Sequence, residues 1–438
     1  MKKQIIKPTI LPGFMELLPR EQMQFNQIIM IIQNTFEKNG FLPMDTPIIE
    51  KSEVLLAKGG EETDKQTYSF DRGRNNLALR FDLTVPFARY SAQYLPELTF
   101  PFRRYQIGKV FRGERNQKGR FREFYQCDID VISNRELSIA NDAELPSIMH
   151  TIFKRIGLKN FKIRINNRKL LNGFLEYLEI FDSTKVLRSI DKIYKIGIDT
   201  FKVEMNGLGV TEDKIFSIID FISISGKNDE ILDSLKKLGM ENDTFLSGLR
   251  ELEQTITYMK YFGIPDESYV IDLKIARGLD YYTGTVYETI LNDYPEFGSI
   301  CSGGRYDNLA QYYTIQKLQG VGMSIGLTRL FSLMLEKGML KESQFGNLTR
   351  VLILTMDDNV EFAAGIAEKM KSHGINTQIY FEDDKLARKL SYANKLGIEY
   401  VIIIGEREIK NGTLQVKNMI TGEQKELNIK DTISALGG

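Results

Sequence analysis

The sequence is short of several residue types on which common functions depend. Its 438 residues contain no tryptophan, two histidines and two cysteines. Cys127 and Cys301 stand far apart and lack the close spacing of metal-ligand pairs, so neither a disulfide scaffold nor a cysteine metal site is expected. Apolar runs such as those at 351–354 and 401–404 are far shorter than the roughly 18 residues of a membrane helix. Pro8 and Pro12 fall where a signal peptide needs its apolar stretch, and we therefore expect a cytoplasmic protein with no membrane partner.

The scarcity of histidine narrows the chemistry. His373 precedes Gly374 at an expected helix end, and His150 lies in an apolar helical stretch, so both are predicted to be structural. Catalysis by a histidine base has few candidates, and arginine and carboxylate side chains are favoured instead. No Gly-x-x-x-x-Gly-Lys-Ser/Thr segment occurs, so any nucleotide must be bound without a Walker A loop.

What is present is a balanced, globular composition with one strongly basic stretch. Hydrophobic residues make up 42% and charged residues 26%, and the 58 basic and 58 acidic residues cancel. Residues 103–122 nevertheless contain eight basic residues and a single acid, Glu114. A solvated face is the ordinary explanation of such a run. Because these arginines alternate with apolar residues in a strand pattern, we expect several of them to face one enclosed surface suited to polyphosphate.

The N-terminal part of the chain predicts an antiparallel sheet. A helix is expected over 21–38, an extended segment over 41–50 and an alternating strand over 77–84. A hairpin is expected with strands at 105–114 and 121–132. On its second strand, alternation places Arg122, Phe124, Gln126, Asp128 and Asp130 on one face, and this mostly polar face is typical of a small-molecule pocket.

The rest of the chain divides into a helical stretch, a return to strands and a terminal α/β domain. Helices are expected over 136–156 and, with loops at 207–209 and 225–228, from 169 to 261. Strands return at 269–274 and 281–290. From about residue 348 a βαβαβ rhythm begins, with strands at 351–355, 377–381, 400–404 and 414–417. We therefore predict an α+β fold with a sheet domain at 1–168 and 263–340, a helical insertion at 169–262 and an α/β domain at 348–438.

Two glycine-containing segments are ambiguous when each is taken alone. Gly320–Gly326 has nearly the spacing of a dinucleotide-binding loop, but 312–318 is predicted to be helical, so the glycines are interpreted as making room for helix packing or for a ligand. Arg329 follows them and would by itself be interpreted as a surface residue. Arg277–Thr285 joins an arginine, an acid and two tyrosines at a glycine-flanked bend, which fits a β-turn as well as a site.

Together these segments resemble the histidyl-tRNA synthetases, a family of class II aminoacyl-tRNA synthetases. Leu42–Glu50 resembles class II motif 1, Phe111–Arg115 with Arg122–Phe124 resembles motif 2, and Gly322–Leu330 resembles motif 3. The specificity for histidine is carried by Leu79–Thr84, Tyr125–Asp130, Arg277–Tyr282 and Ser302–Asp307. The resemblance implies a class II antiparallel sheet flanked by helices and an anticodon-binding domain at 348–438.

The resemblance also implies an activity and a site. The activity is ATP-dependent ligation of L-histidine to tRNA(His) through a histidyl-adenylate, in a homodimer, with Mg²⁺ held mainly by the ATP phosphates and no dedicated protein metal site. Arg277 and Arg112 would contact the reacting carboxylate and α-phosphate. The implied histidine-binding residues are Asp82, Leu83, Thr84, Arg112, Gln126, Asp130, Arg277, Tyr281 and Tyr282. The implied ATP-binding residues are Arg112, Glu114, Arg120, Phe124 and Arg329, and the implied contacts to the tRNA acceptor end are Arg115, Gln117 and Lys118.

Three positions depart from the family pattern, and one alternative stays open. Thr328, Ser133 and Ser302 stand where the family commonly has an acid, a glycine, and a glycine or alanine. None of the three is among the residues implied in chemistry. The alternative is a synthetase-like regulatory subunit or tRNA sensor that binds histidine or tRNA without aminoacylation. Such regulatory subunits typically lack the anticodon domain and parts of the arginine signature, both of which are present here.

Overall fold

The computed structural model describes residues 6–57, 65–114, 119–276, 281–340, 348–356 and 359–437. Phe25–Met339 form the bulk of one compact unit and Leu340–Gly438 the bulk of a second. In these ranges no helix is both long enough and apolar enough to cross a membrane. The mixture of helices with large antiparallel sheets confirms the predicted α+β class.

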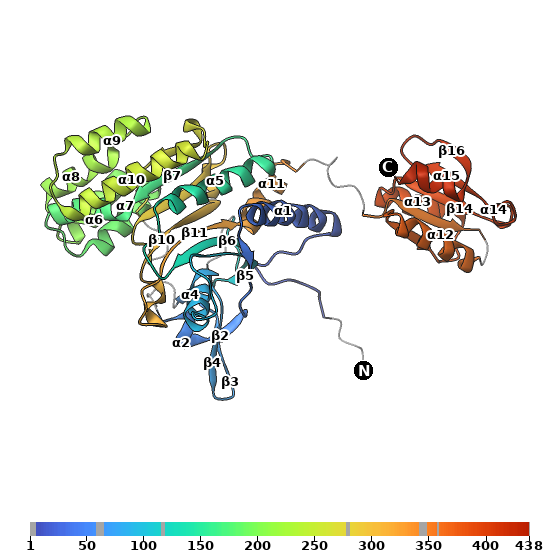
Figure 1. Cartoon of the computed structure of the whole chain (residues 1–438), viewed down its shortest axis with the longest axis horizontal. Helices are drawn as coiled ribbons and strands as arrows, with labels where there is room; N and C mark the ends of the chain where they lie inside the picture. The colour runs from blue at the N-terminus through green and yellow to red at the C-terminus, as the bar shows by residue number, and fades with distance from the viewer. Residues whose placement is uncertain are drawn as a thin grey trace. The chain divides into compact units, whose positions relative to one another are not determined.

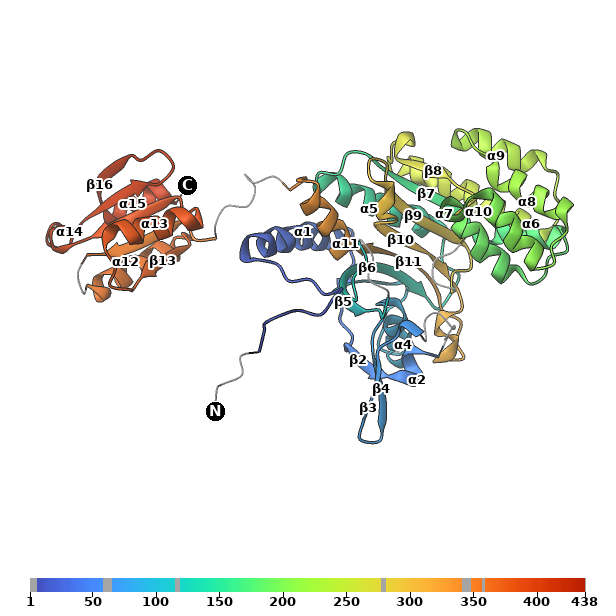
Figure 2. The same cartoon turned by 180° about the vertical axis from the view of Figure 1, so that it is seen from behind.

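The large unit is built on an eight-stranded sheet with the order β1-β5-β6-β11-β10-β9-β7-β8 (Figures 1 and 2). The end pairs β1–β5 and β7–β8 are parallel, and the pairs between them are antiparallel. The predicted hairpin is confirmed as β5 paired with β6. The strand bounds are β1 Leu42–Pro43, β5 Phe102–Phe111, β6 Glu123–Ser133, β7 Phe161–Asn167, β8 Tyr269–Ile271, β9 Thr285–Leu291, β10 Cys301–Tyr306 and β11 Gln319–Gly326.

Different layers cover the two faces of this sheet (Figure 1). Helices α1 (Pro19–Lys38), α5 (Ala140–Arg155) and α11 (Leu327–Glu336) cover one face, where the ring of Phe25 packs edge-on against Tyr125 and Phe331. The other face is covered by α4 (Thr84–Gln93), together with α2 (Ser52–Leu55) and a small sheet of order β2-β4-β3. The bounds of that sheet are β2 Ile49–Lys51, β3 Ser69–Arg72 and β4 Asn75–Leu79. The polar face of β6 therefore points toward α4, and its apolar face toward α1 and α11.

A group of helices lies at the β7 end of the sheet (Figures 1 and 2). Its members are α6 Arg168–Tyr177, α7 Ser183–Gly207, α8 Glu212–Ser223, α9 Asn228–Lys237 and α10 Asp243–Tyr261. The helical character predicted for 169–261 is correct, and both predicted loops fall between helices. Strand β7, just before this group, was not predicted, although the alternation of buried Phe161, Ile163 and Ile165 was a visible signal.

The C-terminal unit is a five-stranded sheet of order β13-β12-β14-β15-β16. The first three strands are parallel and the last two antiparallel to their neighbours. The strands are β12 Val351–Thr355, β13 Thr377–Tyr380, β14 Tyr400–Ile404, β15 Thr413–Asn418 and β16 Gln424–Asn428, and the helices are α12 Val360–Ser372, α13 Leu386–Leu396, α14 Glu406–Asn411 and α15 Ile429–Leu436. All four strands predicted in this unit are confirmed as β12 to β15, whereas β16, α14 and α15 were not predicted. His373 ends α12 and its Nδ1 lies 2.8 Å from the Lys369 carbonyl oxygen, as expected of a structural histidine.

Two sequence predictions about local structure are wrong. The strand predicted over 77–84 ends at Leu79, and Thr84 already begins α4. Alternation fails because Arg80 is as deeply buried as Phe81 and Leu83: its Nε donates to the Lys109 carbonyl oxygen at 2.8 Å. The helix predicted over 312–318 is not formed, because Ile315 is fully exposed and the segment has no apolar face to bury. A 3₁₀ turn, η3 (Leu309–Tyr312), stands in its place, and two others are η1 (Asp266–Ser268) and η2 (Pro295–Phe297).

Candidate active site

Three buried carboxylates meet at the polar face of β6. Asp128 and Asp130 lie two residues apart on that strand, and Asp82 comes from the loop between β4 and α4. Each of the three side chains is at most 2% exposed. Burial raises the pKa of Asp82 to about 6 and that of Asp128 to about 7, and the charge of the other acids adds to both shifts. Burial therefore makes the ionised form costly in this acid cluster, which is made of Asp82, Asp128 and Asp130.

Asp82 is positioned by the start of α4. Its Oδ1 accepts the backbone N–H of Val85 at 3.0 Å, in the first turn of the helix, where the helix dipole also favours a negative charge. Its other oxygen, Oδ2, is buried and has no hydrogen-bond partner in the described part of the chain. Asp82 and Thr84 had been expected on one face of a strand; they are instead brought together by a loop and a helix start.

Asp130 is the acid with partners of its own. Its Oδ2 lies 2.6 Å from Nη2 of the fully buried Arg104, and its Oδ1 accepts the hydroxyl of Tyr306 at 2.7 Å. Gly322 on β11 stands opposite Asp130, and a Cβ there would come within 2.0 Å of Asp130 Oδ1. Gly322 therefore allows close packing of β11 against the Asp130 side chain. The glycine-rich segment Gly320–Gly326 lies on β11, and its last residue, Gly326, is the N-cap of α11.

Other residues of the predicted histidine site lie around the acid cluster. Gln126 donates from Nε2 to the Ser324 hydroxyl at 2.7 Å, while its Oε1 has no partner among the described residues. Tyr281 hydrogen-bonds Thr84 and Tyr282, and its ring packs edge-on against that of Tyr282 at 4.8 Å. Leu83 is fully buried, and its carbonyl oxygen accepts Arg104 Nη2 at 3.2 Å.

A cationic pocket adjoins the acids at Gln126. Its charged lining is Arg112, Arg120, Arg329 and Glu114, and the ring of Phe124 lies below the Arg112 guanidinium at 5.1 Å. Arg120 Nη1 pairs with Glu114 Oε2 at 2.9 Å. Arg329 donates to the carbonyl oxygens of Gly119 and Ser299 at 2.9 and 2.7 Å. Burial and the nearby Arg120 and Arg112 lower the pKa of Arg329, so this end of the site favours an anion.

The structure corrects one interpretation of the arginines and agrees in part with another. Arg329, taken alone, was interpreted as a surface residue, but it lines this pocket. The expectation that several basic residues of 103–122 face one enclosed surface holds for Arg112 and Arg120, which line the pocket. Arg103 pairs with Glu144 and Lys109 with Glu123, outside the pocket lining. Arg277, Arg115, Gln117 and Lys118 lie outside the described residues.

Sequence reasoning missed several supporting residues. Arg104 and Tyr306 hold Asp130, and Ser324 holds Gln126. Alternation on β11 was the signal for Ser324, which is opposite Asp128 in the register. Arg305, in the motif Ser302–Asp307, is structural because it pairs with Asp142 of α5 at 2.6 Å on the other side of the sheet.

The three departures from the family pattern have local explanations in two cases. The Thr328 hydroxyl accepts the backbone N–H of Tyr125 at 2.8 Å and so ties α11 to β6. The Ser133 hydroxyl accepts the N–H of Arg135 at 3.1 Å in the turn after β6. Ser302 is exposed at the pocket lining. In the described ranges, no three His, Cys, Asp or Glu side chains gather to hold a metal ion.

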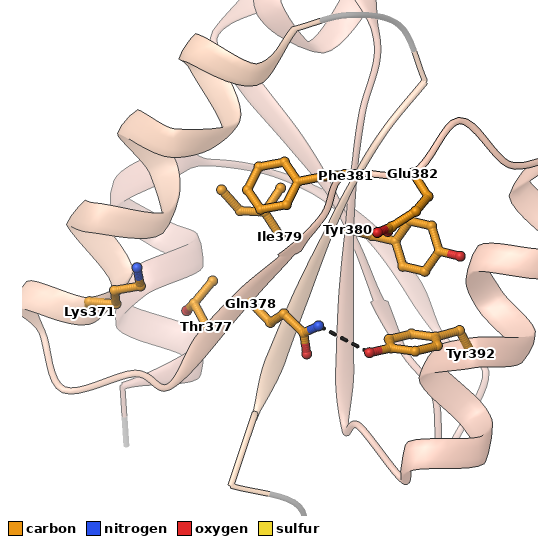
Figure 3. Close-up of a pocket in the computed structure, with 8 residues that line it drawn as sticks. All are labelled: Lys371, Thr377, Gln378, Ile379, Tyr380, Phe381, Glu382 and Tyr392. Atoms are coloured by element: carbon orange, nitrogen blue, oxygen red, sulfur yellow. Dashed lines mark hydrogen bonds between the residues drawn. The ribbon is translucent and has the colours of Figure 1, made fainter.

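A second pocket lies in the C-terminal unit, along the edge strand β13 (Figure 3). Tyr380, Phe381 and Tyr392 contribute rings, and the side-chain amide of Gln378 donates to the Tyr392 hydroxyl at 3.1 Å. The Phe381 side chain is 65% exposed. Glu382 lies beside Tyr380, and Lys371 and Thr377 line the other end of the pocket (Figure 3).

Comparisons with known proteins cover both units. A family model described as histidyl-tRNA synthetase matches residues 13–330, and one described as anticodon binding domain matches residues 350–437. A histidine–tRNA ligase of Clostridium tetani is 56% identical over 436 residues, which cover 100% of this chain and 99% of the relative. The crystal structure of histidyl-tRNA synthetase from Nostoc sp. PCC 7120 is 39% identical, covers 99% of both chains and has a TM-score of 0.88.

The regulatory alternative is not favoured by these comparisons. A Bacillus halodurans structure titled as an ATP phosphoribosyltransferase regulatory subunit/histidyl-tRNA synthetase covers 92% of this chain with a TM-score of 0.76, but at 21% identity it shows the fold alone. The ligases match at far higher identity and over the full length, including the C-terminal unit. The chain belongs to the histidyl-tRNA synthetase family.

Proposed function

We propose that this protein ligates L-histidine to tRNA(His) in two steps, with ATP as the energy source and a histidyl-adenylate as the intermediate. The observation that carries the proposal is the charge division of the site. A cluster of buried acids suited to a ligand rich in N–H donors adjoins, at Gln126, an arginine-lined pocket suited to phosphates. Histidine and ATP have these two complementary characters, and their reacting groups would meet where the acid cluster adjoins the pocket.

The first step needs alignment and charge more than proton transfer. The histidine carboxylate attacks the α-phosphorus of ATP and expels pyrophosphate, and it is already ionised at neutral pH. Arg112 lies between the acid cluster and the arginine-lined pocket. It lines that pocket, and its Nε donates to the Phe81 carbonyl oxygen at 3.0 Å, beside Asp82. We assign it to the carboxylate and the α-phosphate, where a fixed cation stabilises the developing charge. By the family resemblance Arg277 shares this role.

We assign histidine recognition to the acid cluster. We place the α-amino group at Asp82, Thr84 and Gln126, whose free oxygens Asp82 Oδ2 and Gln126 Oε1 lack donors in the described structure. The imidazole is assigned to Asp130 and Tyr282, with Tyr281 and Leu83 closing the wall. An amino acid without ring N–H groups would leave buried polar groups unpaired, at a cost of roughly 1–3 kcal/mol each.

ATP is assigned to the arginine-lined pocket. Phe124 would stack on the adenine with Glu114 at its edge, and Arg120 and Arg329 would contact the outer phosphates. Mg²⁺ is a hard cation that prefers oxygen ligands and keeps several waters, so we assign it mainly to the phosphate oxygens. It would offset negative charge on the leaving pyrophosphate.

In the second step the histidyl group is transferred to the tRNA. The terminal ribose hydroxyl of tRNA attacks the adenylate, and Arg115, Gln117 and Lys118 are proposed to meet the acceptor end. We assign the anticodon to the C-terminal unit, whose aromatic pocket at β13 offers ring faces for unstacked bases (Figure 3).

The same resemblance supports proposals about organisation. Residues 1–168 and 263–340 would form the catalytic domain, 169–262 an insertion and 348–438 the anticodon-binding domain. We also propose a homodimer in the cytoplasm, and mass measurement in solution tests the first of these two features.

ATP–pyrophosphate exchange with each amino acid in turn, without tRNA, tests the proposed activity. Exchange with histidine alone is expected. Absence of exchange with every amino acid, in protein that still binds histidine, would overturn the proposal in favour of a binding protein.

A further inference from the structure

Asp128 is a buried acid to which the proposed mechanism gives no part. It lies on β6 between Gln126 and Asp130, and its side chain points to the same face as theirs. The register places it opposite Gln106 of β5 and Ser324 of β11, so it sits in the centre of the polar face and not at an edge.

The hydrogen bonds around Asp128 leave one oxygen unused. Ser324 accepts the side-chain amide of Gln126 and hydrogen-bonds the Asp128 carboxyl, which gives a short chain from Gln126 to Asp128. Asp128 Oδ1 is buried and has no hydrogen-bond partner among the described residues. Such an orphaned buried acceptor is costly, and it is expected where a ligand supplies the missing donor.

Asp128 differs from Asp130 in the charges and hydrogen-bond donors around it. Asp130 has its oxygens engaged by Arg104 and Tyr306, whereas Asp128 has no cation at contact distance in the described structure. The charged and titratable groups that act on Asp128 or on which it acts are Arg104, Asp82, Asp130, Tyr281, Tyr282, Cys127 and Cys301. Arg104 is the one cation among these described groups, and it is shared by three acids.

We propose that Asp128 is a further specificity-determining residue of the amino-acid site, whose free Oδ1 accepts an N–H of the bound histidine. The inference rests on the proposed function. With Asp128, the acid cluster selects for N–H donors with three carboxylates instead of two. Asp128 lies between the residues assigned to the α-amino group and to the imidazole, which are the two parts of histidine that carry N–H donors.

A proton accompanies this contact. Burial raises the pKa of Asp128 to about 7, so the protonated carboxyl is populated near neutral pH. A donor on Oδ1 favours the ionised form, so the carboxyl proton passes to solvent as histidine binds. Histidine binding near neutral pH therefore releases a fraction of a proton from this residue.

Titration calorimetry of the full-length protein with L-histidine, in buffers of different ionisation enthalpy, tests the proposal. Asp128→Asn keeps the shape and an acceptor for Ser324 but turns an N–H group toward the ligand. It should weaken histidine binding by roughly 10- to 100-fold, the range for a charged hydrogen bond, and remove the Asp128 share of the released proton. ATP affinity should not change.

Glu288→Gln is the matched control. Glu288 of β9 is a half-buried acid of this sheet whose pKa is also raised to about 7 by desolvation, but the register places it three strands away from Asp128. This variant should bind histidine with the wild-type affinity and proton release. Equal affinity and proton release in Asp128→Asn and wild type would overturn the proposal.

Thermal unfolding separates recognition from a structural role. The empty Asp128→Asn protein should unfold at the wild-type temperature or higher, because the orphaned acid is removed. A lower unfolding temperature with intact histidine affinity would assign Asp128 to the fold. If the wild type itself binds no histidine, the proposed function fails as well, and the two failures are thereby distinguished.

Discussion

The two ends of the site differ in how their charges are compensated. At the end proposed to bind the amino acid (the amino-acid end), Asp82, Asp128 and Asp130 share Arg104, Asp82 also lies near Arg112, and burial raises the pKa of all three acids. At the end proposed to bind phosphates (the phosphate end), Arg112, Arg120 and Arg329 share Glu114 among the described lining residues. Each end lacks the charge that its proposed ligand brings. The sheet therefore carries two groups of incompletely compensated charge side by side, one acidic and one basic, and each lowers stability until a ligand of opposite charge binds.

Removing Asp130 should have the largest effect, because it takes away the acid that the amino-acid end compensates best. Asp130→Ala leaves Arg104 fully buried with no carboxylate at contact distance and Tyr306 without its acceptor. We expect a loss of about 3–5 kcal/mol in unfolding free energy, measured by urea denaturation. The double variant Arg104→Leu/Asp130→Leu should recover much of this loss, and a double variant no more stable than Asp130→Ala would contradict the account.

Removing a charge from the phosphate end should affect the reaction instead. Arg112→Ala should lower ATP–pyrophosphate exchange by roughly 100- to 1,000-fold, the scale of one lost transition-state contact. Arg103→Ala is the control on the same strand pair, because Arg103 pairs with Glu144 at 2.8 Å outside the pocket lining. Exchange near the wild-type rate in Arg112→Ala would remove this arginine from the mechanism.

The deficit at the amino-acid end should also appear in the pH dependence of stability. Burial raises the pKa of Asp82 from its ordinary value of 3.8 to about 6 in the folded protein. The folded state therefore holds this proton more tightly than the unfolded state does. The stability of the folded protein therefore falls as pH rises from about 4 to about 6, and the full penalty remains above that range. Asp82→Asn escapes it, so the variant should gain up to roughly 3 kcal/mol over the wild type above pH 6 and almost nothing near pH 4. Unfolding temperatures measured across this range test the trend, and a gap that does not grow with pH would contradict it.

The sequence predicts this comparison only in part, for physical reasons. The shared face of Gln126, Asp128 and Asp130 follows from strand alternation, which is a local property. The contact of Asp130 with Tyr306, 176 residues away, depends on the register of three strands and is beyond any local pattern. Alternation failed at Arg80 because tertiary hydrogen bonds bury a charged residue where the pattern predicts solvent. Individual roles came from the family resemblance and not from the pattern.

The smallest effect on ligand binding is expected from removing one hydroxyl group beside the acid cluster. Tyr282→Phe should weaken histidine binding by roughly tenfold, the value of a single hydrogen bond, and leave ATP binding unchanged, because Tyr282 is placed beside the acids and not among the arginines. Tyr287→Phe makes the same change on the opposite face of the sheet, where the hydroxyl donates to the Asp142 carbonyl oxygen at 2.5 Å. This control should lose stability and keep its histidine affinity. Calorimetric titration with each ligand measures both variants, and equal losses for histidine and ATP in Tyr282→Phe would show that the two ends of the site are not separable.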